Sequence, residues 1–137
     1  MATTVDAPSR QEPSGATPAL DCVFSPKGVA VVGVTTTPGT VPYDILHNIL
    51  VSGYQGRVYP VAPGKRTVCD VSAYRYVVDI EDPVDLAVIV FPSGVVDRAL
   101  KQCGEKGIRA AIVISAGFLE VGPKGIQREE QLRQTCA

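Results

Sequence analysis

The sequence has few residues that bind metals and no cysteine pair with the spacing of a zinc site. It contains one histidine, and its four cysteines, Cys22, Cys69, Cys103 and Cys136, are widely scattered without a CxxC pair. A structural zinc site needs closely spaced cysteine and histidine ligands. We therefore expect no metal site, and we expect the cysteines to be reduced thiols in a cytoplasmic protein.

Long hydrophobic runs and an excess of charge are also absent. No apolar run reaches the roughly 20 residues of a membrane span, and the net charge is −1. We therefore expect neither a membrane nor a nucleic acid as partner. The N-terminal segment contains Asp6 and Glu12 and has no continuous apolar stretch, which excludes a secretory signal and disfavours a transit peptide. We predict a disordered tail at 1–20 and one domain at 21–137.

What the sequence does contain is an alternation of apolar segments with amphipathic ones. Strands are predicted at 28–34, 56–63, 85–92 and 109–117, and helices at 43–53, 93–107 and 123–137. Between them, "TVCDV" predicts a short extra strand and "SAYRYVVDI" a helical turn. Strands that are apolar at every position are buried on both faces, as in a parallel sheet covered by helices. The alternation predicts an α/β fold with a doubly wound, mostly parallel sheet.

The predicted helices differ in their apolar faces. The first turns Ile45, Leu46, Ile49 and Leu50 to one side and ends at Gly53, and the second turns Val95, Val96, Ala99, Leu100 and Cys103 inward and ends at Gly107. The third is polar, with only Ile126 and Leu132 as clear anchors. His47 lies between apolar neighbours, and we interpret it as a helix-surface or packed residue without a catalytic role.

The segment "VAVVGVTTTPGT" (29–40) resembles a ligand loop but fits neither of the common phosphate loops. In doubly wound sheets, ligands bind outside the carboxyl ends of the strands, near the point where strand order reverses. A Walker A loop that starts at Gly33 would have a glycine where Pro38 stands, and Gly39 is followed by Thr40 instead of lysine. The dinucleotide fingerprint fails as well, because Thr35 occupies its middle-glycine position.

The end of the second predicted strand narrows the choice of ligand. It reads Val61-Ala62-Pro63, without the acidic residue that binds the ribose of NAD, and Lys65 and Arg66 follow. These two cations suit a phosphate on the ribose. NADP and coenzyme A (CoA) both carry one, and spacing alone does not distinguish them. The pair could also be a solvated loop, and the threonines could serve only as helix caps.

A resemblance distinguishes the two ligands. The segments "FSPKGVAVVGVTTTPGT", "YDILHNILVSGYQGRVYPVAP", "PVDLAVIVFPSGVV" and "CGEKGIRAAIVISAGFLEVG" resemble the Rossmann-like CoA-binding domain of NDP-forming acyl-CoA synthetases. That family includes ADP-forming acetate–CoA ligases and is related to the α subunit of succinyl-CoA ligase. The resemblance extends from about residue 20 to residue 125.

The resemblance implies a binding role for four strand ends. The loop after the first strand faces the CoA phosphates together with the lysine of "PGK", the segment 91–93 flanks the adenine, and the segment 114–117 follows the pantetheine arm. The implied CoA-binding residues are Gly33, Thr35, Thr36, Thr37, Pro38, Gly39, Val61, Pro63, Lys65, Phe91, Pro92, Ser93, Ile114, Ser115, Ala116 and Gly117. The chain departs from the family at Pro42, where glycine is common, and at Ala62, where asparagine is common. The second change removes one polar contact.

The resemblance also implies a function. The chain is expected to bind CoA or acyl-CoA as the CoA-binding module of an NDP-forming acid–CoA ligase, with no catalytic residue of its own. In that family the phosphohistidine and the nucleotide-binding grasp belong to other domains, and members add one more strand after the last one predicted here. We therefore expect partners among downstream ligase domains, a partner subunit or a second copy, which could pair with the apolar edge segment 110–114. Two alternatives stay open: a stand-alone regulatory protein that senses CoA or acyl-CoA, and an NADP-binding domain.

Overall fold

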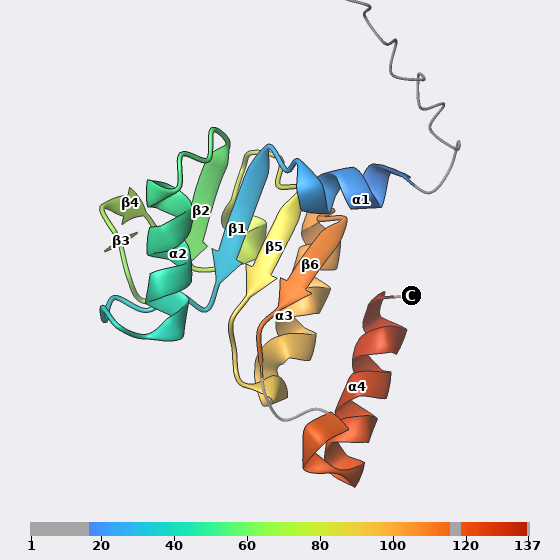
Figure 1. Ribbon diagram of the computed structural model, residues 1–137. Coiled ribbons are helices and arrows are strands. Elements are labelled where there is room, and N and C mark those ends of the chain that lie inside the picture. Colours follow the sequence, from blue (N-terminus) through green and yellow to red (C-terminus); the bar gives the residue numbers. More distant parts are fainter. Residues whose placement is uncertain (1–16, 116–118, 137) are drawn as a thin grey trace, which may run out of the picture.

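The protein folds around a four-stranded parallel sheet (Figure 1). The computed structural model describes residues 17–115 and 119–136. The strands are β1 (Gly28–Val32), β2 (Arg57–Val61), β5 (Leu86–Ile89) and β6 (Ala110–Val113), in the spatial order β2-β1-β5-β6. The chain passes from β1 to β2 on one side and then returns to add β5 on the other side. Strand order therefore reverses between β1 and β5, and the predicted doubly wound α/β fold is confirmed.

The two central strands are buried along their whole length, as their apolar sequences predict. Every residue of β1 and of β5 is buried. Alternate side chains of β1 enter two different cores: Ala30 and Val32 belong to one, and Val29 and Val31 to the other. This is the pattern of a sheet that is covered on both faces.

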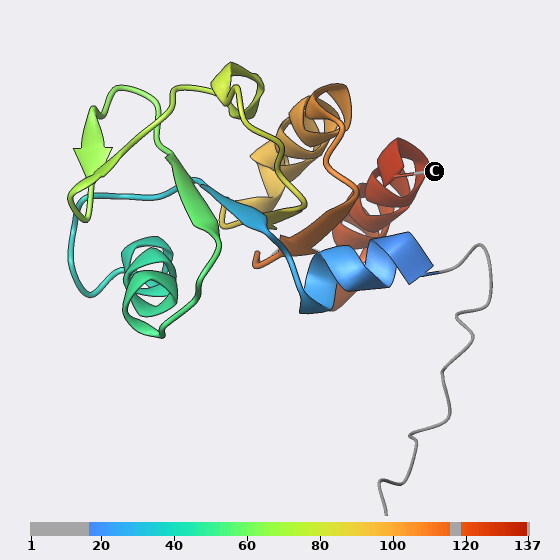
Figure 2. The ribbon, with the colours of Figure 1, turned by 90° about the horizontal axis from the view of Figure 1, so that it is seen from above.

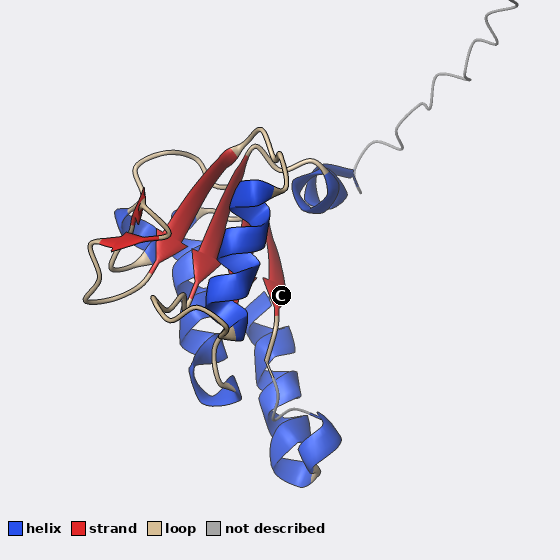
Figure 3. Ribbon diagram, turned by 60° about the vertical axis from the view of Figure 1, so that its left-hand side comes forward, coloured by secondary structure: helices blue, strands red, loops and turns tan. Residues whose placement is uncertain are grey.

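Helices cover both faces of the sheet (Figures 2 and 3). α2 (Val41–Val51) and α1 (Thr17–Phe24) lie on one face, where Leu46 of α2 is fully buried and α1 contacts β6. α3 (Ser93–Lys106) and the 3-10 turn η1 (Val77–Asp79) lie on the other face. α4 (Pro123–Cys136) packs against α3 and follows the short turn η2 (Leu119–Val121). None of the helices described is long and apolar enough to cross a membrane.

The excursion between β2 and β5 contains the predicted helical turn, but the single short strand predicted at "TVCDV" is wrong, because the chain reverses within this segment and forms two strands. β3 (Thr67–Val68) and β4 (Val71–Ser72) form an antiparallel hairpin, and η1 is the predicted helical turn. Cys69 and Asp70, at the tip of the hairpin, both have a positive φ, 50° and 62°. Two such residues are characteristic of the type I′ turn that joins tightly paired strands. The excursion closes on the sheet, where the Ala62 N–H donates to the Tyr74 carbonyl at 2.9 Å.

Three further sequence-based predictions are wrong in detail. Residues 17–20, which we expected to be disordered, belong to α1, because this helix contacts β6. Val95 is 41% exposed, because only one side of the first turn of α3 faces the core, and Val96 occupies that side. Ile126 is 52% exposed and is therefore no anchor for α4; Leu132 does pack against the core.

Polar contacts replace the missing apolar anchor of α4. The Thr135 hydroxyl and the Gln131 amide both donate to the Asp97 carboxylate of α3, and Lys101 pairs with the same carboxylate at 3.0 Å. The hydrogen bond from Thr135 and the neighbouring Lys101 lower the pKa of Asp97 below its usual value. Asp97 therefore links α4 to α3 as a carboxylate.

Candidate functional site

Three strand ends meet at Gly33, the first residue after β1. Its φ is +93°, and a Cβ atom at this position would lie 2.4 Å from the Val90 carbonyl oxygen and 2.9 Å from Cδ1 of Phe91, which follow β5. The N–H groups of Gly33 and Val34 both point at the Val61 carbonyl of β2, at 3.1 and 3.4 Å. Only glycine allows this approach. Gly33, Val61 and Phe91, three predicted site residues, are thus brought together at the carboxyl edge of the sheet.

The loop from Thr35 to Thr40 is a compact turn that leads into α2. The Thr35 and Thr40 hydroxyl oxygens lie 2.7 Å apart, and the Thr40 hydroxyl donates to the Thr37 carbonyl at 2.8 Å. A hydroxyl has one proton, so the shared hydrogen bond must be donated by Thr35. Thr40 precedes α2 without capping it through its side chain. The idea that the threonines serve only as helix caps therefore does not hold for Thr40.

The same loop offers backbone donors for an anion. Within the described part of the chain, the N–H groups of Thr35, Thr36 and Thr37 donate no hydrogen bond. They lie just before the N-terminus of α2, where the helix dipole also favours negative charge. Asp44 partly opposes this effect, because its carboxylate accepts a hydrogen bond from the Gly39 N–H at 3.2 Å. The capacity of the loop to bind a phosphate therefore depends mainly on residues 35–37.

A tight turn after β2 presents a lysine at the same edge. The Lys65 N–H donates to the Ala62 carbonyl at 3.1 Å, and Gly64 has a φ of +79°. Proline followed by glycine at the centre of a turn is typical of the type II geometry. Lys65 and Arg66 are exposed, and neither forms an ion pair among the described residues. Both side chains are therefore free to reach a phosphate.

The remaining predicted site residues follow β5 and β6 at this edge. Pro92 precedes α3, and Ile114, which is 40% exposed, continues the sheet through a hydrogen bond of 2.8 Å from its N–H to the Ile89 carbonyl. Thr36, Thr37, Pro38 and Gly39 are exposed, as are Pro63 and Pro92. Ser93 begins α3, and Ser115 follows Ile114. Ala116 and Gly117 lie outside the described residues.

Sequence reasoning missed three residues near this edge. Arg75, Tyr76 and Arg98 line a small cavity of about 170 Å³ on the α3 face, together with Phe91. Arg98 lies three residues after Val95 on the predicted helix, so the sequence indicates that these two side chains share one face of that helix. It gives no such indication for Arg75 or Tyr76. Arg75 and Tyr76 come from the excursion before β5, so only the fold brings them near α3.

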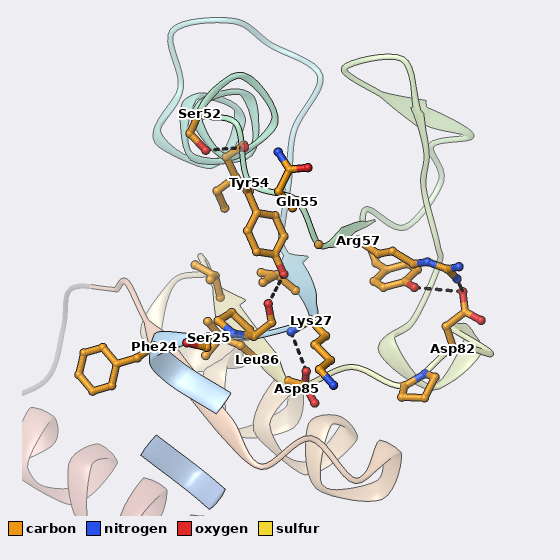
Figure 4. Close-up of a pocket in the computed structure, with 17 residues that line it drawn as sticks. Phe24, Ser25, Lys27, Ser52, Tyr54, Gln55, Arg57, Asp82, Asp85 and Leu86 are labelled. Atoms are coloured by element: carbon orange, nitrogen blue, oxygen red, sulfur yellow. Dashed lines mark hydrogen bonds and ion pairs between the residues drawn. The ribbon is translucent and has the colours of Figure 1, made fainter. Parts of the chain in front are cut away.

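A larger cavity, of about 980 Å³, lies at the opposite edge of the sheet (Figure 4). The residues that line it lie beside the amino ends of the strands, and several of them form hydrogen bonds with one another. The Lys27 N–H donates to Asp85 at 2.8 Å, the Arg57 guanidinium and the Tyr59 hydroxyl both donate to Asp82 at 3.0 Å, and Tyr54 donates to the Pro26 carbonyl. Burial raises the pKa of Tyr54 and of Tyr59. Parallel α/β sheets bind ligands at the carboxyl ends, so we do not assign this cavity to the coenzyme.

His47 has the surface position that the sequence suggests. It is exposed on α2, and its ring stacks on that of Tyr43, with 6.1 Å between the ring centroids. The prediction of a helix-surface residue is confirmed. Tyr43 in turn hydrogen-bonds the Cys69 thiol, which raises the pKa of the Tyr43 hydroxyl.

Comparison with known proteins identifies the family of this chain. Residues 27–137 match the family model described as the CoA binding domain. The α subunit of ADP-forming acetate–CoA ligase I from Pyrococcus furiosus is 38% identical over 125 residues, which cover 85% of this chain and 26% of that protein. The ADP-forming acetate–CoA ligase of Methanocaldococcus jannaschii is 43% identical over 103 residues, which cover 75% of this chain and 14% of that protein.

Solved structures give the same result. The dinucleotide-forming acetyl-coenzyme A synthetase 1 of Candidatus Korarchaeum cryptofilum superposes with a TM-score of 0.82 at 38% identity, covering 85% of this chain and 25% of that one. A conserved hypothetical protein from Pyrococcus furiosus shares the fold, with a TM-score of 0.63 at 23% identity over 87% of its own length. This chain spans only 14% to 26% of the ligases that it matches. It belongs to the family of CoA-binding domains that the ADP-forming acid–CoA ligases contain.

Proposed function

We propose that this chain binds CoA or acyl-CoA across the carboxyl ends of its strands and orients the thiol for an NDP-forming acid–CoA ligase. The observation that carries the proposal is the meeting of three strand ends at Gly33, with unpaired loop N–H groups on one side and Lys65 on the other. A cation and a set of backbone donors at one sheet edge suit the pyrophosphate of the coenzyme.

In this proposal, different predicted residues contact different parts of the coenzyme. The N–H groups of Thr35 to Thr37 and the ammonium of Lys65 face the pyrophosphate, and the segment 91–93 lies beside the adenine. The pantetheine arm follows the segment 114–117 towards the position where the thiol reacts. Holding a long flexible coenzyme in one orientation lowers the entropic cost of attack by its thiol.

The chemistry itself belongs to other parts of a ligase in this proposal. The matching relatives are far longer than this chain, and two of them are named as ligase α subunits. We propose that residues 21–137 act with further ligase domains or with a partner subunit. The purified chain, given acetate or succinate, ATP and CoA, is expected to form no acyl-CoA above background. Turnover that persists through a second purification would contradict this assignment.

Titration calorimetry with CoA, NAD and NADP tests the binding proposal directly. We expect CoA to bind and both dinucleotides to bind much more weakly. No carboxylate directly follows β2 to hold the ribose hydroxyls of NAD, and the loop after β1 has Thr35 in place of the middle glycine of the fingerprint that binds NAD and NADP alike. Tight binding of NADP without binding of CoA would show that the cations of the β2 turn serve the alternative ligand.

Lys65→Ala tests the role of the β2 turn. A charge-assisted hydrogen bond contributes about 1.5–3 kcal/mol, and less where solvent screens it. We therefore expect the dissociation constant for CoA to rise about tenfold, with the fold intact. Lys27→Ala is the matched control, since Lys27 is also exposed but lies at the opposite edge of the sheet. An unchanged dissociation constant for a folded Lys65→Ala protein would mean that this lysine is only solvated.

A further inference from the structure

The small cavity on the α3 face lies directly beside the proposed coenzyme site. It is lined by Val32 and Val61, the last residues of β1 and β2, and by Ala99 of α3. Phe91 lines the cavity and also contacts the position of Gly33. A ligand that crosses the sheet edge at Gly33 can therefore extend from the loop before α2 into this cavity.

Two arginines and a glutamine give the apolar cavity a basic rim. Arg98 and Gln102 lie one turn apart on α3, and Arg75 comes from the segment between β4 and η1. The Arg75 guanidinium lies 5.4 Å from the centroid of the Tyr76 ring. Both arginines are exposed, and neither forms an ion pair with any residue that the structure describes.

Nearby carboxylates already have other partners. Asp79 accepts a hydrogen bond from the Tyr76 N–H at 3.1 Å, and Asp97 binds Lys101 and α4 as described above. The positive charge of the two arginines is therefore not neutralised by these acids. An anion is the ligand that this rim selects.

The size and lining of the cavity restrict the ligand further. A volume of about 170 Å³ is well below the 300–1,000 Å³ that holds a whole drug-sized ligand. The cavity can therefore hold one end of a larger molecule. Valine and aromatic side chains suit a flat heterocycle, and the arginines suit a phosphate attached next to it.

We propose that this cavity receives the adenosine 3′-phosphate end of CoA, and that Arg98 and Arg75 pair with the 3′-phosphate. This inference rests on the proposed binding of CoA. The coenzyme carries two separate anionic groups, and the structure provides two separate basic regions: the loop and Lys65 for the pyrophosphate, and the arginine rim for the 3′-phosphate. The rim then selects CoA over ligands that lack this phosphate.

Dephospho-CoA, which lacks only the 3′-phosphate, is the probe that tests the assignment. Dissociation constants for CoA and for dephospho-CoA are measured by calorimetry on the wild-type chain and on Arg98→Gln, Arg75→Gln and Lys65→Ala. Arg109→Gln is the control, since Arg109 is exposed but precedes β6 at the opposite edge of the sheet. Circular dichroism and thermal unfolding verify that each variant is folded.

We expect the wild-type chain to bind CoA at least tenfold more tightly than dephospho-CoA. Arg98→Gln and Arg75→Gln should each weaken CoA about fivefold to tenfold and leave dephospho-CoA unchanged, because each loses one charge-assisted contact to the 3′-phosphate. Lys65→Ala should weaken both ligands equally. Arg109→Gln should change neither.

Three results would overturn the inference. Equal wild-type affinity for the two ligands, or equal losses for both ligands in the arginine variants, would show that the rim does not bind the 3′-phosphate while leaving CoA binding intact. If Lys65→Ala were the one variant that lost the preference for CoA over dephospho-CoA, the 3′-phosphate would be assigned to the β2 turn instead of the arginine rim. Absence of CoA binding by the wild-type chain would refute the proposed function, and this inference with it.

Discussion

Gly33→Ala is the change that most directly tests the geometry of the site. The new Cβ would lie 2.4 Å from the Val90 carbonyl oxygen and 2.9 Å from the Phe91 ring, at a backbone φ of +93°. The backbone conformation alone costs an alanine about 1–2 kcal/mol. Forcing the loop after β5 away from β1 adds about 1–3 kcal/mol, the usual cost of overpacking.

Gly53→Ala is the matched control for this change. Gly53 has nearly the same φ, +85°, but nothing lies within 4 Å of the Cβ position, so only the conformational cost applies. Urea unfolding followed by circular dichroism gives the free energy of unfolding of both variants. We expect Gly33→Ala to lose about 1–3 kcal/mol more than Gly53→Ala. That difference is large against a total stability of about 5–15 kcal/mol.

The binding measurement separates the site from general stability. Gly33→Ala should also weaken CoA, because it separates the loop before α2 from Phe91, whereas Gly53→Ala should not. Equal losses of stability in the two variants, with equal affinity for CoA, would refute the view that Gly33 holds the strand ends together.

The remaining predictions concern thiols, acid and association. Burial, and secondarily the nearby Cys136, raises the pKa of the Cys103 thiol to about 11. In an iodoacetamide time course at pH 8, the exposed Cys136 should therefore be alkylated well before Cys103. Similar alkylation rates for the two thiols would contradict this. The lowered pKa of Asp97 stabilises the α3–α4 contact above its unfolded value of about 3.9, and this contribution is lost as the pH falls through the folded pKa. Hydrogen exchange in α4 should therefore rise in acid, and a wild-type acid profile in Asp97→Asn would count against the assignment. Among the described residues β6 pairs with β5 alone, and Ile112 is 41% exposed, so we expect a homodimer or a partner strand at this edge. A monomer by light scattering at micromolar concentration, with the amides of 110–114 protected, would exclude this association.

Local sequence patterns sufficed to predict the elements of the fold. The apolar runs within 28–34 and 85–92 became β1 and β5, which are buried at every position, because a strand without a polar face must be covered on both sides. The stop after α3 was equally local. Gly107 adopts a φ of 87° and ends the helix, and glycine adopts this conformation without strain.

The order and the contacts of these elements were decided by the tertiary structure. Nothing near Gly33 in the sequence shows that its Cβ position is occupied by Val90 and Phe91; the crossover that places β5 beside β1 creates that contact. Val95 and Ile126 have apolar neighbours at helical spacing but remain exposed, because a hydrophobic pattern does not show which side of a helix the rest of the chain covers.

For the binding site too, the sequence determined the local stretches of chain and left open which distant residues pack together. Loop composition, together with family resemblance, placed the proposed phosphate-binding residues, since each loop is a continuous stretch of chain. The arginine rim is not continuous: Arg75 follows β4, and Arg98 lies on α3. Residues that far apart become neighbours only when two elements pack, and packing depends on the sum of many weak contacts along the whole chain, not on any local pattern.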